Sequence, residues 1–346
     1  MDHYGLLSLL PTAFVITTAV LTHRPVAALL VGVTIGILLL EPAAVVSTFS
    51  DIMLEVMQDE TIAWVIMVCG LMGSLIYILI KTGGASAFAR KMATHANTRN
   101  TSRLVTWFLG MVLFIDDYRN AIAIGNSMKK VTDSFKVSRA MLSYVVDSTA
   151  APTCVLVPIS TWAVFFAAVL ETTGTAAVGE GMMMYISGIP FMFYPIIALL
   201  LVPLVATGRF PLIGPMRAAE ELAQQGIAAM EPVDQIEVVD GPVDENGQPR
   251  SNIWVFLVPL LALICYSWYF DIALLRGIIA TLALTIPRAV TMKLLGAYEA
   301  LDAVLDGFKI MIPPLAIVVV AFMFKTVNDQ LGLPQYVIES VQPLMS

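Results

Sequence analysis

The sequence predicts an all-α membrane protein, a polytopic bundle of transmembrane helices. Of the 346 residues, 58% are hydrophobic and only 13% are charged, and the mean hydropathy is +0.83. Soluble domains carry about 25% charged residues. Seven apolar runs approach the roughly 20 residues that a helix needs to cross a bilayer. These runs are continuous rather than alternating in polarity, which favours helices over a β-barrel.

The expected spans follow the apolar runs in chain order. The runs are Leu6–Leu21, Val26–Leu40, Ile62–Ile80, Tyr144–Leu170, Met182–Ala206, Ile253–Phe270 and Ile310–Phe324. Residues 1–4 carry Asp2 and no lysine or arginine, so they lack a signal-peptide layout and we expect the first run to remain as a span. Cys69, Cys154 and Cys265 lie far apart inside apolar runs, which predicts small core residues rather than a disulfide or a zinc site.

Lysine and arginine are distributed unevenly among the connections between runs. Basic residues gather in 81–103, 129–139 and 209–250, whereas 50–60 and 171–181 contain none. By the positive-inside rule, the basic connections are cytoplasmic and the N-terminus faces outward.

This polarity pattern also suggests a division of the chain. We expect an N-terminal membrane half (1–206), a cytoplasmic polar linker (207–252) and a C-terminal membrane half (253–346). The linker holds a helix-compatible stretch, "PMRAAEELAQQGIAAM", followed by a segment rich in acids, proline and glycine. We expect its acidic residues to be solvated, as is usual for such a linker.

The segment between Arg103 and Lys129 is too short for two full spans. It has about 25 residues, whereas two spans would need roughly 40. It must therefore form one span with a return, two short half-helices, or a re-entrant hairpin. Irregular backbone at membrane depth is tolerated where it lines a cavity or is buried in protein.

Two polar clusters interrupt this apolar chain, "FIDDYRNAIAIGNSMKKVTD" and "YVVDSTAAPTCVLVPISTW". Ionisable groups at membrane depth usually mark ion or proton paths. Proline frees an upstream carbonyl, so "DSTAAP" is expected to unwind. Discontinuous helices that join carboxylates, hydroxyls and freed carbonyls form the cation sites of secondary transporters. The expected cation- and proton-binding residues are Asp116, Asp117, Asn120, Asp147, Ser148 and Thr149, with Asp116, Asp117 and Asp147 as the sodium ligands.

A further set is expected to support this site. It consists of Arg119, Asn126, Thr132, Asp133, Pro152, Ser160 and Thr161. Asp133 also fits a solvated or helix-capping acid, and Asp117 could simply pair with Arg119 or Lys129. Competition between a proton and a cation for one carboxylate would couple their flows. Burial raises a carboxylate's pKa and a nearby cation lowers it, so which aspartate titrates is left open.

The two clusters together resemble the signature region of the NhaC-type sodium/proton antiporter family. The matching residues are Phe114, Asp116, Asp117, Tyr118, Asn120, Gly125, Thr132, Asp133, Ser138, Arg139, Asp147, Ser148, Thr149, Ala150, Ala151, Pro152, Ser160, Thr161 and Trp162. The resemblance implies an inverted-repeat ion transporter in a bacterial inner membrane that exchanges sodium, or another monovalent cation, for protons. Family members usually continue beyond the region like 329–334 with a "G-T-S-W-G" block, so 253–346 is expected to be incomplete. Some short relatives are associated with tetracycline resistance.

Several other functions remain as alternatives. Cation-coupled or proton-coupled drug efflux, for example of tetracycline, is the first. A non-transporting remnant or assembly partner is the second. An intramembrane aspartyl protease would need a GxGD motif, which is absent, so we expect no enzyme activity. No phosphate loop ending in GK[ST] occurs, so we expect gradient-driven transport without ATP or a cofactor. The expected partners are the lipid bilayer and a small cation, with no nucleic acid, and a homo-oligomer is left open.

Overall fold

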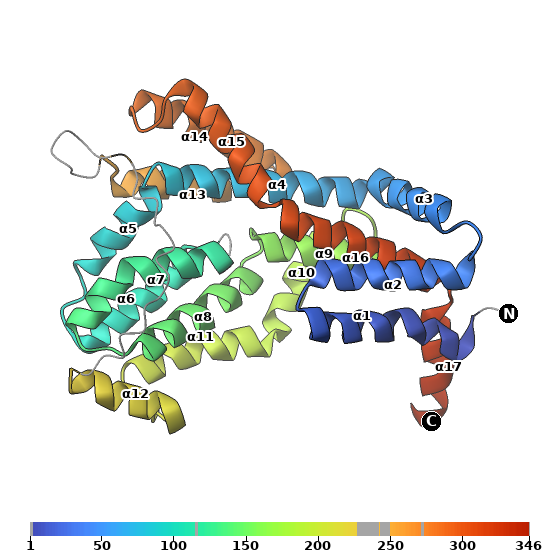
Figure 1. The fold of residues 1–346 in the computed structure, drawn as a ribbon. Coiled ribbons are helices and arrows are strands. Elements are labelled where there is room, and N and C mark those ends of the chain that lie inside the picture. The colour runs from blue at the N-terminus through green and yellow to red at the C-terminus, as the bar shows by residue number, and fades with distance from the viewer. Residues whose placement is uncertain (1–2, 115–116, 227–241, 243–249, 271–272, 346) are drawn as a thin grey trace. The chain divides into compact units, whose positions relative to one another are not determined.

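The protein is all-α, as the sequence predicts. The computed structural model describes residues 3–114, 117–226, 242, 250–270 and 273–345, without the side chains of 117–120, 122–123, 126 and 343–345. Across these described residues, regular structure consists of helices, and no strand occurs. Figure 1 shows the helices in chain order. Apolar helices of membrane-spanning length confirm a polytopic helical membrane protein.

The chain forms two compact units. The first comprises residues 1–66 and 310–346, and the second comprises residues 67–309. The predicted halves 1–206 and 253–346 with their linker 207–252 concern membrane topology, and they stay a prediction.

The first unit is built on close contact between α2 and α16. Cβ atoms added at Gly32 and Gly36 would lie 2.9 Å from a ring carbon of Phe324 and 2.1 Å from Val327 Cγ1, respectively. Such small residues four apart let two membrane helices approach closely. The elements of this unit are η1 (Gly5–Leu9), α1 (Leu10–Thr22), α2 (Pro25–Leu40), α3 (Val45–Gln58), α16 (Ile312–Gln330) and α17 (Leu333–Met345).

The second unit holds both polar clusters. Its elements are α4 (Glu60–Lys81, which begins in the first unit), α5 (Gly84–Ala93), α6 (Arg99–Val112), α7 (Asp117–Ser134), α8 (Arg139–Leu156), α9 (Thr161–Thr172), α10 (Gly181–Gly188), η2 (Ile189–Phe191), α11 (Phe193–Ala206), α12 (Gly214–Gln224), α13 (Ile253–Tyr269), α14 (Leu274–Thr291) and α15 (Ala297–Ile310). Helix α8 lies against α6, α7 and α11 (Figure 1).

The described helices reproduce most of the expected spans, with one addition. Gly5–Thr22, Glu60–Lys81, Leu274–Thr291 and Ile312–Gln330 are each long and apolar enough to cross a membrane. The sequence analysis missed the third, α14, because threonines and two arginines interrupt its apolar pattern. In the folded helix, Thr281 and Thr285 donate their hydroxyls to the carbonyls of Gly277 and Thr281, both at 2.7 Å, which hides their polarity.

Three other candidate spans are broken. The pairs α2 with α3, α8 with α9, and residues 181–191 with α11 bend by 119°, 46° and 52°, respectively. The segment between Arg103 and Lys129 belongs to two helices, since α6 ends at Val112 and α7 begins at Asp117. Which of the three predicted arrangements it takes in the membrane stays a prediction. The discontinuous helices of the predicted fold are therefore present, whereas the inverted repeat stays a prediction.

Backbone approach between α4 and α15 is a strong packing constraint in the second unit. Ser74 is fully buried, and its hydroxyl donates to the carbonyl of Val304 at 2.6 Å. A Cβ added at Gly307 would lie 2.4 Å from Ser74 Cα and 2.7 Å from the Gly73 carbonyl oxygen. Because the obstructing atoms are backbone, only glycine fits at position 307.

We therefore expect Gly307→Ala to lower the free energy of unfolding by about 1–3 kcal/mol, the usual cost of overpacking. The measurement is unfolding of the purified protein by SDS in mixed micelles. Gly188→Ala is the control, because a Cβ there meets no atom within 4 Å. Equal stability of the two variants would contradict the close approach of α4 and α15.

Candidate functional site

The two predicted polar clusters lie on neighbouring helices, α7 and α8, which pack against each other and against α6. Ser138 begins α8 as its N-cap, since its hydroxyl accepts the amide hydrogen of Met141 at 3.0 Å. Near this end, Arg139 donates to both carboxylate oxygens of Asp133, at 2.8 and 2.7 Å. Both partners of this ion pair are well exposed, so Asp133 is a solvated acid, which was the alternative reading of this residue.

Neighbouring residues on α8 face different surroundings. Asp147 is exposed and Ser148 is half-buried. Thr149 is fully buried, and its hydroxyl donates to the Val145 carbonyl at 2.5 Å. A Cβ added at Gly110 would lie 2.7 Å from Thr149 Cγ2, so Thr149 packs tightly against α6. The three residues therefore do not form one cluster in the described structure.

The expected unwinding at "DSTAAP" is wrong, because α8 continues through Pro152 as far as Leu156. Proline removes one amide donor, which leaves the Ser148 carbonyl without its usual helical partner. The next carbonyl, that of Thr149, also accepts the Thr153 hydroxyl at 2.6 Å. The helix continues past the proline, and the break comes later, at 157–160.

Side chains satisfy the carbonyls at that break. Ser160 is fully buried; its hydroxyl donates to the Cys154 carbonyl at 2.5 Å and accepts the Ala163 amide hydrogen at 3.1 Å. Ser160 is thus the N-cap of α9, and Thr161 is the first residue of that helix. The Tyr185 hydroxyl donates to the Val155 carbonyl. Ser160, a predicted supporting residue, has a clear structural role here.

The break between α6 and α7 contacts the end of α8. Cys154 is fully buried and its Sγ donates to the Phe114 carbonyl at 2.8 Å. Phe114 follows α6, which ends at Val112, and Asp117 is the first residue of α7. The beginning of the first polar cluster and the middle of the second therefore meet at this contact.

The same contact indicates where Asp147 lies along the axis of α8. Asp147 and Cys154 are seven residues apart, so they share one side of α8 at a separation of about 10 Å along its axis. The Asp133–Arg139 pair near one end and the Phe114–Cys154 contact near the other set the α7–α8 register. In that register, the backbone of Asp117 lies on the order of 10 Å along the helix axes from that of Asp147.

The remaining predicted residues are only partly described. Asp116 lies outside the described residues, as do the side chains of Asp117, Arg119, Asn120 and Asn126, although the backbones of these four belong to α7. Thr132 is buried and donates its hydroxyl to the Met128 carbonyl at 2.9 Å. Within the described part of the chain, no group of three or more His, Cys, Asp or Glu residues is arranged to hold a metal ion.

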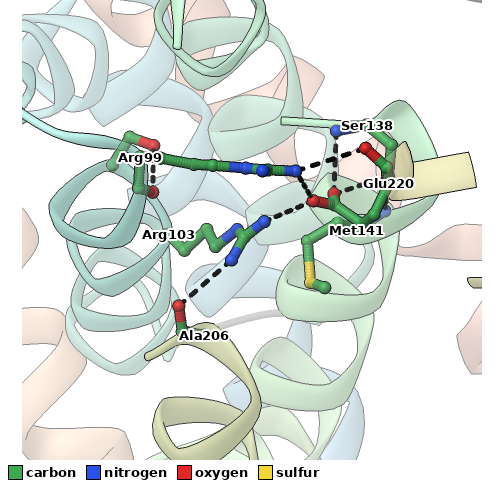
Figure 2. A network of polar contacts seen from close by, with 7 residues as sticks. Arg99, Arg103, Ser138, Met141, Ala206 and Glu220 are labelled. Atoms are coloured by element: carbon green, nitrogen blue, oxygen red, sulfur yellow. Dashed lines mark hydrogen bonds and ion pairs between the residues drawn. The ribbon is translucent and has the colours of Figure 1, made fainter. Parts of the chain in front are cut away.

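Sequence reasoning missed a further polar cluster, separate from the two predicted ones. In it, Glu220 of α12 is enclosed by two arginines (Figure 2). Glu220 is only 1% exposed, in contrast to the expectation that the acids of 207–252 are solvated. Its Oε2 pairs with Arg99 and Arg103 of α6. Its Oε1 accepts hydrogen bonds from the backbone amide and the hydroxyl of Ser138, at 2.9 and 2.8 Å.

Helix ends add to the electrostatics of this Glu220 cluster. The carboxylate lies at the N-terminus of α8, where the helix dipole favours a negative charge. Arg103 donates to the carbonyl of Ala206, the last residue of α11, at 3.2 Å, where the dipole favours a positive charge. On α6, outside the apolar spans, burial lowers the pKa of Arg103, while the Glu220 charge opposes this shift and Arg99 adds to it.

A weak signal for this cluster exists in the sequence. Arg99 and Arg103 are four residues apart, so they share a helix face. Met216, Glu220 and Ala223 fall on one face of α12, which puts an acid on the apolar side of that helix. The cluster also brings together three segments, 90–103, 129–139 and 207–252, that the positive-inside rule assigns to one side of the membrane.

Comparisons with known proteins give one distant relative. The chain is 26% identical over 344 residues to a Haemophilus influenzae protein whose name is given as "Uncharacterized protein". The match covers 95% of this chain and 61% of the relative, so the chain spans less than two thirds of the relative's length. No protein-family profile matches the chain, and no solved structure matches it.

The Asp133–Arg139 pair is expected to contribute little to stability. We expect Asp133→Asn to change the free energy of unfolding by less than about 1 kcal/mol, because exposed ion pairs are weak. Ser138→Ala should cost about 1–2 kcal/mol, because it removes a helix cap. SDS titration in mixed micelles measures both values. A larger loss in Asp133→Asn than in Ser138→Ala would contradict the solvated placement of Asp133.

Proposed function

We propose that the protein is a secondary active transporter that exchanges sodium, or another monovalent cation, for protons across a bacterial inner membrane. The observation that carries this proposal is the hydrogen bond from Cys154 to the Phe114 carbonyl. It joins the chain just after α6 to the last turn of α8, so the ends of these two helices meet. Broken helices in a membrane protein are the usual frame of a cation site, because they bring carboxylates and backbone oxygens together.

In this proposal, the carboxylates are those of Asp116 and Asp117, which are adjacent in the sequence, and of Asp147 on α8. Carboxylates bind either a proton or a hard cation such as sodium. When a cation arrives, it stabilises the ionised form and a proton leaves. If both loaded forms reorient across the membrane, the two flows are coupled. Asn120 and Ser148 are proposed as neutral oxygen ligands. Thr149 is left out, because its buried hydroxyl donates to the Val145 carbonyl and it packs against α6.

The distribution of charge in the second unit supports this mechanism. Asp133 has an exposed arginine partner, and Glu220 has one buried arginine partner, Arg103, and one half-buried partner, Arg99. Asp147 has neither an ion pair nor a side-chain hydrogen bond among the described residues. An acid in the middle of a candidate span that no described cation neutralises suits a site whose counterion is the cargo.

Purified protein in liposomes tests the proposal. A proton gradient is imposed, a pH-sensitive dye is enclosed, and sodium, potassium and tetracycline are added in turn. We expect sodium to restore the dye signal. Asp147→Asn and Asp116→Asn should each lower the initial rate by at least about tenfold, since each removes an intramembrane charge.

Asp133→Asn is the matched control, because it makes the same chemical change at an aspartate of α7 that already has an exposed arginine partner. Its rate should stay within about twofold of the unmodified protein, as expected for a surface pair. A response to tetracycline alone would favour drug efflux. No response to any substrate by folded protein would favour the non-transporting alternative.

A further inference from the structure

Helix α12 is attached to the rest of the second unit at few points. Its buried residues are Glu220 and Ala223. Met216 is half-buried and packs against an apolar cluster that includes Met141 and Val205. Leu222 is 46% exposed. An isolated helix of 11 residues is marginal in water, so the folding of α12 depends on this small contact area.

The partner of Glu220 is a carboxylate receptor formed without α12. It consists of the guanidinium groups of Arg99 and Arg103 and the backbone amide and hydroxyl of Ser138. Figure 2 shows these groups converging on the two carboxylate oxygens. The receptor is cationic and the carboxylate is its counterion. Attachment of α12 therefore depends on polar contacts more than on apolar burial. Glu220 supplies the charge, and Arg99 also donates to the Glu220 main-chain oxygen and to the side-chain oxygen of Gln224.

Such a contact suits a reversible attachment. The desolvation of buried ions offsets much of their attraction, so a buried ion pair adds little net stability. Removing the Glu220 carboxylate would leave buried Arg103 and half-buried Arg99 without their counterion, which is unfavourable. Because α12 makes few apolar contacts, it can leave and let water reach both arginines. Elements of this kind open locally, below the free energy of global unfolding.

Docking of α12 also links several helix ends. Glu220 holds the first turn of α6 and the N-cap of α8, and Arg103 extends the link to the last carbonyl of α11. These helices contact one another, and α8 carries Asp147. Alternating access needs helices or groups of helices to move against each other. A docked α12 restrains that movement at this end of the unit.

We propose that α12 is a displaceable latch. Docked through Glu220, it holds the ends of α6, α8 and α11 together and slows transport, and undocked, it releases them. Glu220 is in this scheme a positioning residue that never touches the cargo. The docking step stands independently, whereas the effect on transport rests on the proposed function.

Thiol labelling tests the docking step. Ala223 is 6% exposed, so Ala223→Cys introduces a thiol that undocking uncovers. Cys265 is exposed and is replaced in Cys265→Ser, whereas Cys69 and Cys154 are buried. In liposomes with a membrane-permeant maleimide, adding Glu220→Gln should speed labelling at position 223 at least about tenfold, since it removes the charge that holds α12.

Glu221→Gln is the matched control, because Glu221 is the next residue of α12 and pairs only with exposed Arg217 within the described structure. It should change the labelling rate less than about twofold, as expected for a surface pair. If Glu220→Gln does not fold, the Ala223→Cys protein that keeps Glu220 provides a second measurement. In that protein, Cys at position 223 should be labelled faster than buried Cys154, because α12 opens without global unfolding.

The liposome flux assay tests the effect on transport. Glu220→Gln should raise the maximal rate of cation-driven proton flux by about threefold or more and leave the half-saturating cation concentration within about twofold, because the latch is remote from the cargo. Glu221→Gln should change neither value.

The outcomes test the docking of α12 and its effect on transport separately. Unchanged labelling in Glu220→Gln, or labelling at position 223 as slow as at Cys154, would overturn the latch. Faster labelling with an unchanged or lower maximal rate would overturn its restraining role. If the unmodified protein moves no cation and no proton, the proposed function and the restraining role fail together. The labelling rates then still decide whether α12 undocks.

Discussion

The requirement that buried backbone carbonyls find a donor governs the centre of the second unit. Where α8 ends, Ser160 and Tyr185 supply hydroxyl donors to the carbonyls of Cys154 and Val155. Cys154 in turn donates to the carbonyl of Phe114 at the neighbouring break. In a membrane, an unpaired carbonyl costs several kcal/mol. By donating hydrogen bonds, these side chains remove that cost at the helix breaks. The position of the proposed cation site follows from where donors are available, rather than from proline alone.

At the N-terminal end of α8, the protein itself neutralises a buried carboxylate. Glu220 is buried, but two arginines, a helix N-terminus and a hydroxyl compensate it. Asp147, about two turns and a half into the same helix, has no such compensation among the described residues. One acid is thus bound to the protein, and the other is open to a mobile counterion. This contrast distinguishes a structural carboxylate from a candidate transport carboxylate.

Small residues set how closely the helices approach. The missing Cβ at Gly32 and Gly36 leaves room for side chains of α16. In the same way, Gly110 leaves room for Thr149, and Gly307 leaves room for the backbone of α4. Between membrane helices, close packing replaces much of the hydrophobic driving force, because lipid tails are as apolar as leucine. The hairpin of α7 and α8 is consequently held by tight contact with α6 along its length and by polar contacts near its ends.

The sequence by itself determined the all-α membrane class, most of the apolar spans, and the interruption between Arg103 and Lys129. These follow from composition and span length, which act through the fixed thickness of the bilayer. It also pointed to Asp133 as a solvated acid, one of two readings that it left open. Only the tertiary structure decided that α8 passes through Pro152, that Thr149 faces α6, and that Glu220 rather than Glu221 is buried. Those outcomes depend on donors and cations that approach from other helices, and a pattern along one chain carries no record of which partners meet.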